Sequence, residues 1–178
     1  MSRIFITGMG LISAIGDSVE ENRNSLQYGR SGIGHIRFYQ TAYAGKLPAA
    51  EVKYSTEELN RKLFGQPNPT ITRTSLLALH AAEEAIRDSG LTKEEISSAD
   101  TALVGATTVG GMCLTDELYH DAISKHDGTA YLSSYDYASV TMAIQERHCM
   151  QGEISTINTA CSSSANSILF GARLIRHG

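Results

Sequence analysis

The chain has 178 residues, 42% of them hydrophobic, and its 15 basic and 19 acidic side chains give a net charge of −4. This length predicts one domain or one half of a larger one, and the composition excludes a disordered chain. Because there is no basic excess to neutralise phosphates, a general nucleic-acid binder is excluded as well. No apolar stretch approaches the about 18–20 residues of a membrane span.

Three cysteines, Cys113, Cys149 and Cys161, are too few and too irregularly spaced for a disulfide framework or a C-x-x-C zinc site. The sequence therefore predicts a protein of a reducing, cytoplasmic compartment, without a metal site. Free cysteines are usually buried and pack as small hydrophobes, and we expect this of Cys113 and Cys149.

In the first part of the chain, the apolar, partly β-branched run Ile4–Ile6 predicts a short buried strand over residues 3–7 that ends at a glycine turn. Three capping boxes of the form S/T-x-x-E begin at Ser18, Ser55 and Thr92. They predict helices over 18–28 and 55–64 and a single turn after Thr92. Residues 30–55 are rich in glycine and predict an irregular connection.

The clearest predicted helix runs from about residue 72 to 89, where apolar residues recur at three- and four-residue steps. Further along, strands are predicted over 101–107 and 154–158, and helices over 115–125, 139–148 and 162–176. Strands that alternate with helices indicate an α/β fold with a largely parallel sheet.

Cys161 lies where the last predicted strand turns sharply into the last helix. Small residues surround it, from Thr159 to Ala165, and they permit a tight turn and leave room beside the sulfur. The positive end of a helix dipole stabilises a thiolate, so this position suits a nucleophile. The alternative is an ordinary buried cysteine.

The segment Thr159-Ala160-Cys161-Ser162-Ser163-Ser164 resembles the active-site segment of the β-ketoacyl-acyl carrier protein synthases, the condensing enzymes of fatty-acid and polyketide synthesis. Four further segments resemble that family in the same order along the chain: 6–16, 29–33, 72–85 and 104–111. The elongating synthases of the thiolase-like superfamily are the most similar subgroup.

The resemblance implies that residues 1–178 are the N-terminal domain, and about half, of a layered α/β/α/β/α thiolase-like protein. Cys161 would carry the acyl chain as a thioester, with its backbone N–H in the oxyanion hole. Val109, Gly110 and Gly111 would line the acyl pocket. No cofactor is implied, because the phosphopantetheine arm arrives on the acyl carrier protein.

The implied partners are that carrier protein, acyl and malonyl thioesters, and a second subunit that completes a homodimer or heterodimer. Arg61, Lys62 and Arg73 stand near the family's docking positions for the acidic carrier protein, although an exposed helix face explains the first two equally well. The family's decarboxylation histidines stand in segments that this chain lacks. We therefore expect the 178 residues to be inactive alone.

Three alternatives remain open at this point. A non-catalytic partner subunit of a condensing heterodimer would lack the nucleophile, and Cys161 argues against it. A thiolase-like acyltransferase would use CoA thioesters, and the run Thr159–Ser164 fits it less well. The Gly8-x-Gly10 turn resembles a dinucleotide fingerprint, but Ser13 stands where that pattern needs glycine.

Overall fold

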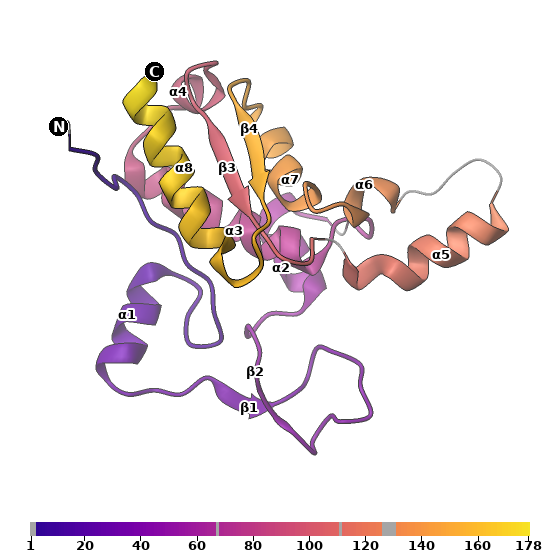
Figure 1. Cartoon of the computed structure of the whole chain (residues 1–178). Helices are drawn as coiled ribbons and strands as arrows, with labels where there is room; N and C mark the ends of the chain where they lie inside the picture. Colours follow the sequence, from indigo (N-terminus) through magenta and orange to yellow (C-terminus); the bar gives the residue numbers. More distant parts are fainter. Residues whose placement is uncertain (1–2, 67, 111, 126–130) are drawn as a thin grey trace. The chain divides into compact units, whose positions relative to one another are not determined.

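The computed structural model describes residues 3–66, 68–110, 112–125 and 131–178. It divides into two compact units, one of 1–6, 69–78 and 91–178 and the other of 7–68 and 79–90. The chain order of the elements is shown in Figure 1, and their bounds are α1 Val19–Gln27, β1 Ile33–His35, β2 Pro48–Ala50, α2 Thr56–Phe64, α3 Arg73–Ser89, α4 Lys93–Ser97, β3 Leu103–Ala106, α5 Thr115–Ser124, α6 Leu132–Tyr135, α7 Ser139–His148, β4 Ile154–Ile157 and α8 Ser163–His177.

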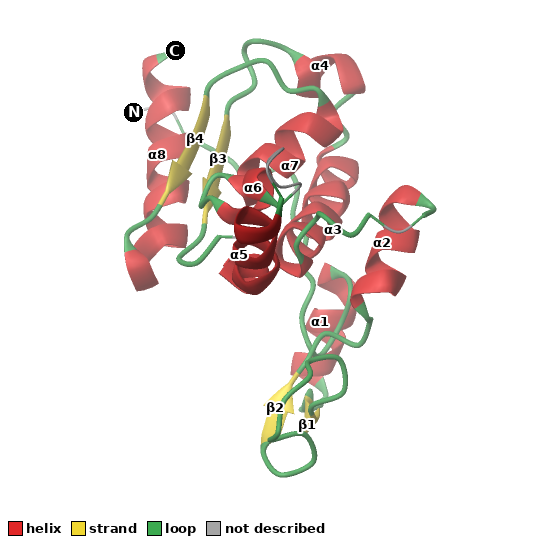
Figure 2. Cartoon of the chain, turned by 90° about the vertical axis from the view of Figure 1, so that its right-hand side faces the viewer, coloured by secondary structure: helices red, strands yellow, loops and turns green. Residues whose placement is uncertain are grey.

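The first unit is built on a parallel pair of strands, β3 and β4, whose register places Leu103 beside Ile154 and Ala106 beside Ile157. Helix α8 covers one face of this pair and α7 the other (Figures 1 and 2). Because side chains alternate along a strand, Val104 faces α8 whereas Gly105 faces α7. This helix–strand–helix layering confirms the predicted α/β class with parallel pairing.

Gly105 allows α7 to approach the sheet closely, since a side chain there would meet the buried Thr141. The hydroxyl of Thr156, on the neighbouring strand, donates to Thr141 Oγ1 at 2.8 Å. The two strands and α7 are therefore tied together by packing and by a side-chain hydrogen bond at one point.

The second unit is held by α1, α2 and the later turns of α3. Leu59 and Leu79 are fully buried in it. Buried Asn22 donates from Nδ2 to the carbonyls of Gly16 and Ser18, at 3.0 and 2.8 Å, and Ser25 donates to that of Ile15 at 2.7 Å. The loop that precedes α1 is therefore fixed to the helix by hydrogen bonds from buried polar side chains.

The helices confirm the predictions from the capping boxes. Full boxes open α2 at Ser55 and α4 at Thr92. At Ser18 only half of the box forms, because the Glu21 carboxylate accepts from the N–H of Asp17 instead of that of Ser18. The long helix is α3, which begins at Arg73 and ends before Gly90, a residue in the left-handed region at φ 71°.

Two sequence predictions in the first part of the chain are wrong. Residues 3–7 form no strand, and the amides just after them are taken by carboxylates of α3: Met9 N–H donates to Asp88 and Leu11 N–H to Glu84, at 3.0 and 2.9 Å. Residues 30–55 are not wholly irregular, because β1 and β2 pair as a short antiparallel ladder from Ile33 with Ala50 to His35 with Pro48.

Candidate active site

Cys161 lies at the carboxyl edge of the β3–β4 pair, between the end of β4 and the start of α8. It sits inside a single 3-10 turn, Ala160–Ser162, and α8 begins two residues later at Ser163. Its side chain is exposed and forms no disulfide. The predicted order of strand, sharp turn and helix is confirmed, with the helix beginning just after the cysteine.

The turn depends on an unusual backbone at Ala160, whose φ is 52° in the left-handed region that non-glycine residues seldom adopt. Such a conformation costs about 1–3 kcal/mol and persists where neighbouring groups hold it. Here the buried Ser163 hydroxyl accepts from the N–H of Thr159 at 2.9 Å and donates to the carbonyl of Ala160 at 2.7 Å. Ser163 therefore closes the turn that presents Cys161.

The backbone N–H groups in the cysteine turn differ in whether they have a hydrogen-bond acceptor. Those of Ser162 and Ser163 donate to the carbonyls of Thr159 and Ala160, respectively. Among the described residues, the N–H of Cys161 has no acceptor. An N–H beside a nucleophile can stabilise the oxygen anion that develops when a thioester carbonyl is attacked.

The glycine turn after β3 lies beside the cysteine turn, because the carboxyl ends of parallel strands meet at one edge of a sheet. Thr108 bridges the two turns: its hydroxyl donates to the carbonyl of Ala160 at 3.2 Å, and its own carbonyl accepts from Asn158 Nδ2 at 3.4 Å. The side chain of Val109, which follows Thr108, is 51% exposed.

Gly110 is buried at φ 56°, and a Cβ there would stand 2.7 Å from the Cα of Tyr137. The predicted pocket residues Val109 and Gly110 are thus close in the chain to a residue that contacts the cysteine turn. Gly111 lies outside the described residues. Sequence reasoning missed Thr108 and Asn158; their positions just after two parallel strands were the signal that could have found them.

The predicted docking residues divide between the two units. Arg61 and Lys62 are exposed in the last turn of α2, and Arg73 begins α3 in the other unit. Lys62 Nζ lies 3.2 Å from Asp17 Oδ2 and 3.6 Å from the centroid of the Tyr54 ring. Lys62 is therefore held within its own unit, whereas Arg61 forms no ion pair within the described part of the chain.

The Tyr54 hydroxyl donates to Asp17 Oδ2 at 2.5 Å. This hydrogen bond, assisted by Lys62, lowers the pKa of the Asp17 carboxyl despite its partial burial. Burial opposes the charged form of Lys62, but interactions with Tyr54 and Asp17 outweigh that effect and raise its pKa. Both pKa shifts favour the charged forms, and in each the hydrogen bond with Tyr54 is the largest favourable cause, ahead of the ion pair between Asp17 and Lys62.

The other two cysteines are Cys149 and Cys113. Cys149 ends α7 at φ 53° and is exposed, so the prediction that it is buried is wrong. It takes the left-handed position that ends a helix, which leaves its side chain outside the core. The side chain of Cys113 lies outside the described residues. No group of three or more potential metal ligands and no membrane-spanning helix occurs in the part of the chain that the structure describes.

Comparison with known proteins identifies the family. The model of the β-ketoacyl synthase N-terminal domain matches residues 1–178, and the chain therefore belongs to this family. It is 30% identical to 3-oxoacyl-[acyl-carrier-protein] synthase 1 of Haemophilus influenzae, over all of this chain and 44% of that protein. It is 27% identical to the actinorhodin polyketide putative beta-ketoacyl synthase 2 of Streptomyces coelicolor, over 98% of this chain and 43% of the relative.

Solved structures agree on the fold. The ishigamide ketosynthase/chain length factor superposes with a TM-score of 0.72 at 26% identity, over 94% of this chain and 44% of the other. A beta-ketoacyl synthase from Burkholderia phymatum superposes with a TM-score of 0.75 at 21% identity, over all of this chain and 44% of the other. The fold is therefore that of the N-terminal half of the thiolase-like ketosynthases, as predicted, and the chain spans less than half the length of the relatives it matches.

Proposed function

We propose that the protein carrying this chain is a β-ketoacyl-[acyl-carrier-protein] synthase of fatty-acid or polyketide synthesis, with Cys161 as its nucleophile. The observation that carries the proposal is the placement of Cys161. In a chain of this family, an exposed thiol stands on a left-handed turn at the start of a helix, beside the glycine turn of the neighbouring parallel strand.

The proposed reaction has two steps. The Cys161 sulfur attacks the carbonyl carbon of an acyl-carrier protein thioester, a C–S bond forms, and the carrier's phosphopantetheine thiol leaves with a proton. Malonyl-carrier protein then loses carbon dioxide, and the resulting carbanion equivalent attacks the acyl carbonyl. The new C–C bond forms as the C–S bond to Cys161 breaks, which gives a β-ketoacyl product and the free thiol.

In the first step, the Cys161 N–H would donate a hydrogen bond to the oxyanion that forms on the thioester carbonyl. The N–H groups of Ser162 and Ser163 cannot take this role, because they already donate to carbonyls within the turn. Val109 and Gly110, together with Gly111, are proposed to line the acyl pocket. The turn that holds Val109 contacts the cysteine turn through Thr108, which favours this role. The decarboxylation step needs acid–base groups that we assign to none of the histidines in these 178 residues.

Arg61 is the docking residue that we favour for the acidic carrier protein, since Lys62 is engaged by Asp17. Arg73 remains part of the proposed docking surface. We also propose that the protein acts as a dimer of such subunits. We place it in a reducing cytoplasmic compartment, which would keep Cys149 and Cys161 as free thiols.

The test is condensation by the intact polypeptide, supplied with an acyl-carrier protein and malonyl-carrier protein. We expect release of carbon dioxide and a β-ketoacyl product, both lost in Cys161→Ala. A non-catalytic partner subunit would give neither with the unchanged chain. Turnover with CoA thioesters alone would instead indicate a thiolase-like acyltransferase.

A further inference from the structure

Thr108 and Asn158 form a clamp on the residue that precedes the cysteine. Thr108 follows β3 and Asn158 follows β4, so the two side chains reach across the carboxyl edge of the sheet. Thr108 Oγ1 donates to the Ala160 carbonyl at 3.2 Å, and Asn158 Nδ2 donates to the Thr108 carbonyl at 3.4 Å. Asn158 Oδ1 also accepts from the Ala160 N–H at 3.4 Å.

Together these bonds enclose the peptide groups of Ala160 from both sides. The Ala160 carbonyl accepts from Thr108 Oγ1 and from Ser163 Oγ, while its N–H donates to Asn158. Ser163 belongs to α8 itself, so it can close the turn locally. Within the described part of the chain, the hydrogen bonds of Thr108 and Asn158 tie the turn to the segments that follow the two strands.

The conformation that they hold is one that alanine disfavours. At φ 52°, Ala160 stays in the left-handed region only if its surroundings offset a cost of about 1–3 kcal/mol. Without the clamp, a larger fraction of molecules would relax at Ala160. In the relaxed state the Cys161 sulfur would no longer be held in one place at the carboxyl edge of the sheet, just before α8.

We propose that Thr108 and Asn158 are positioning residues for Cys161: they hold Ala160 in its left-handed conformation and so keep the sulfur in its reactive place. Neither side chain touches the reacting atoms in this role. The inference rests on the proposed function only in that it takes Cys161 as the nucleophile.

The test is the rate of Cys161 alkylation by iodoacetamide in the intact polypeptide at neutral pH, followed by peptide mass spectrometry. Exposed Cys149, which ends α7, is the reference thiol in the same sample. For Thr108→Val, which removes the hydroxyl but keeps the shape, the ratio of the Cys161 rate to the Cys149 rate should fall about three- to fivefold. Thr108→Ser keeps the hydroxyl and should restore the ratio.

Asn158→Ala should lower the same ratio by a similar factor. The double variant Thr108→Val with Asn158→Ala should fall by less than the product of the two factors, because both residues act through Ala160. Thr115→Val is the matched control: its hydroxyl donates to the Met112 carbonyl beside α5, and the ratio should not change.

Two results would overturn the clamp. In one, Thr108→Val reacts like the unchanged protein; in the other, Thr108→Ser is as slow as Thr108→Val, so that the hydroxyl is irrelevant. Failure of the proposed function has a different signature. In that case Cys161 of the unchanged protein would react no faster than a free thiol, whatever stands at position 108.

Discussion

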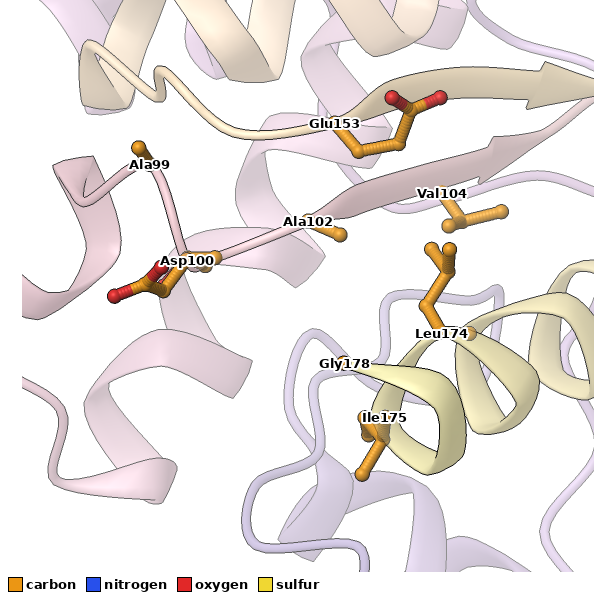
Figure 3. Close-up of a pocket in the computed structure, with 10 residues that line it drawn as sticks. Ala99, Asp100, Ala102, Val104, Glu153, Leu174, Ile175 and Gly178 are labelled. Atoms are coloured by element: carbon orange, nitrogen blue, oxygen red, sulfur yellow. The ribbon is translucent and has the colours of Figure 1, made fainter.

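The two edges of the β3–β4 pair are built in opposite ways. At the carboxyl edge, the turns after the strands are linked by side-chain hydrogen bonds and contain two left-handed residues, Ala160 and Gly110. At the amino edge, a hollow of about 650 Å³ opens between β3 and the end of α8. Figure 3 shows Leu174 of α8 pointing toward Val104 across this hollow. At the carboxyl edge, side-chain hydrogen bonds thus link the turn that holds Cys161 to the turn after the neighbouring strand.

The two edges depend on different kinds of contact. Apolar contacts of Val104 and Leu174 fasten α8 to the strands, and they tolerate looseness because dispersion contacts have no strict direction. The carboxyl edge has to fix one backbone conformation, which only directional bonds can do. Substitutions should therefore be costly in the turns at the carboxyl edge and mild at positions that line the hollow, such as Gly171.

The largest effect is expected for Gly110→Ala at the carboxyl edge. The new Cβ would stand 2.7 Å from Tyr137 Cα and 2.8 Å from the Asp136 carbonyl, on a backbone that already has φ 56°. We expect a loss of about 2–4 kcal/mol in the free energy of unfolding, measured by urea denaturation. If Gly110→Ala were as stable as the unchanged chain, the turn at the carboxyl edge would not be tightly constrained.

Ser163→Ala should have the next largest effect. It removes the hydroxyl that closes the cysteine turn and leaves the Thr159 N–H without its acceptor. Because Ser163 is only 4% exposed, we expect a loss of about 1–3 kcal/mol. Urea melts monitored by circular dichroism would measure it, with Ser167→Ala as the control, since the hydroxyl of half-buried Ser167 bonds only within α8, to the Ser164 carbonyl. Equal losses in the two variants would argue against a special role for Ser163.

Gly171→Ala at the amino edge should act in the opposite direction. Gly171 lies inside α8 and lines the hollow, and a Cβ there would meet nothing within 4 Å. Alanine is the better helix former, so the chain should gain about 0.5–1 kcal/mol in the free energy of unfolding. Destabilisation in the same urea experiment would show that this edge is as tightly packed as the other.

The smallest effect should come from Asp17, which belongs to the other unit and to neither edge. Because its pKa is lowered in the folded state, its stabilising contribution is complete above the unfolded pKa of about 3.9 and is lost as the pH falls through the folded value. Asp17→Asn should remove less than about 1 kcal/mol at pH 7, since the pair is partly exposed.

As the pH is lowered from 5 through the folded pKa of Asp17, the melting temperature of Asp17→Asn should fall less than that of the unchanged chain. Its Cys161 alkylation rate should stay the same. A slower rate would mean that the cysteine turn depends on groups beyond its own edge.

Local signals in the sequence were enough to predict most of the helices. Capping residues such as Ser55 and Thr92 act within one turn, so their effect can be inferred without knowing the fold. The predicted strand over residues 3–7 was wrong because an apolar run defines a strand only when a neighbour accepts its hydrogen bonds. The β1–β2 ladder was missed because its three-residue strands, Ile33–His35 and Pro48–Ala50, show no alternation.

Cys161 could be chosen as the candidate nucleophile from the sequence, but the groups that hold its turn could not. Cys161 is marked by its own neighbours in the chain, from Thr159 to Ser164. The clamp joins Thr108 to Ala160 across 52 residues, and only the pairing of β3 with β4 brings them together. Neither composition nor periodicity indicates that an alanine adopts a left-handed backbone conformation, so the conformation of Ala160 is known only from the structure.

The central claim is that Cys161 carries the acyl group, and the most direct test is to locate that group. The intact polypeptide would be incubated with an acyl-carrier protein, trapped in acid, digested and mapped by mass spectrometry. We expect an acyl thioester on the peptide that contains Cys161, and none in Cys161→Ala. An acyl group on Cys149 or Cys113, or one that persists in Cys161→Ala, would contradict it.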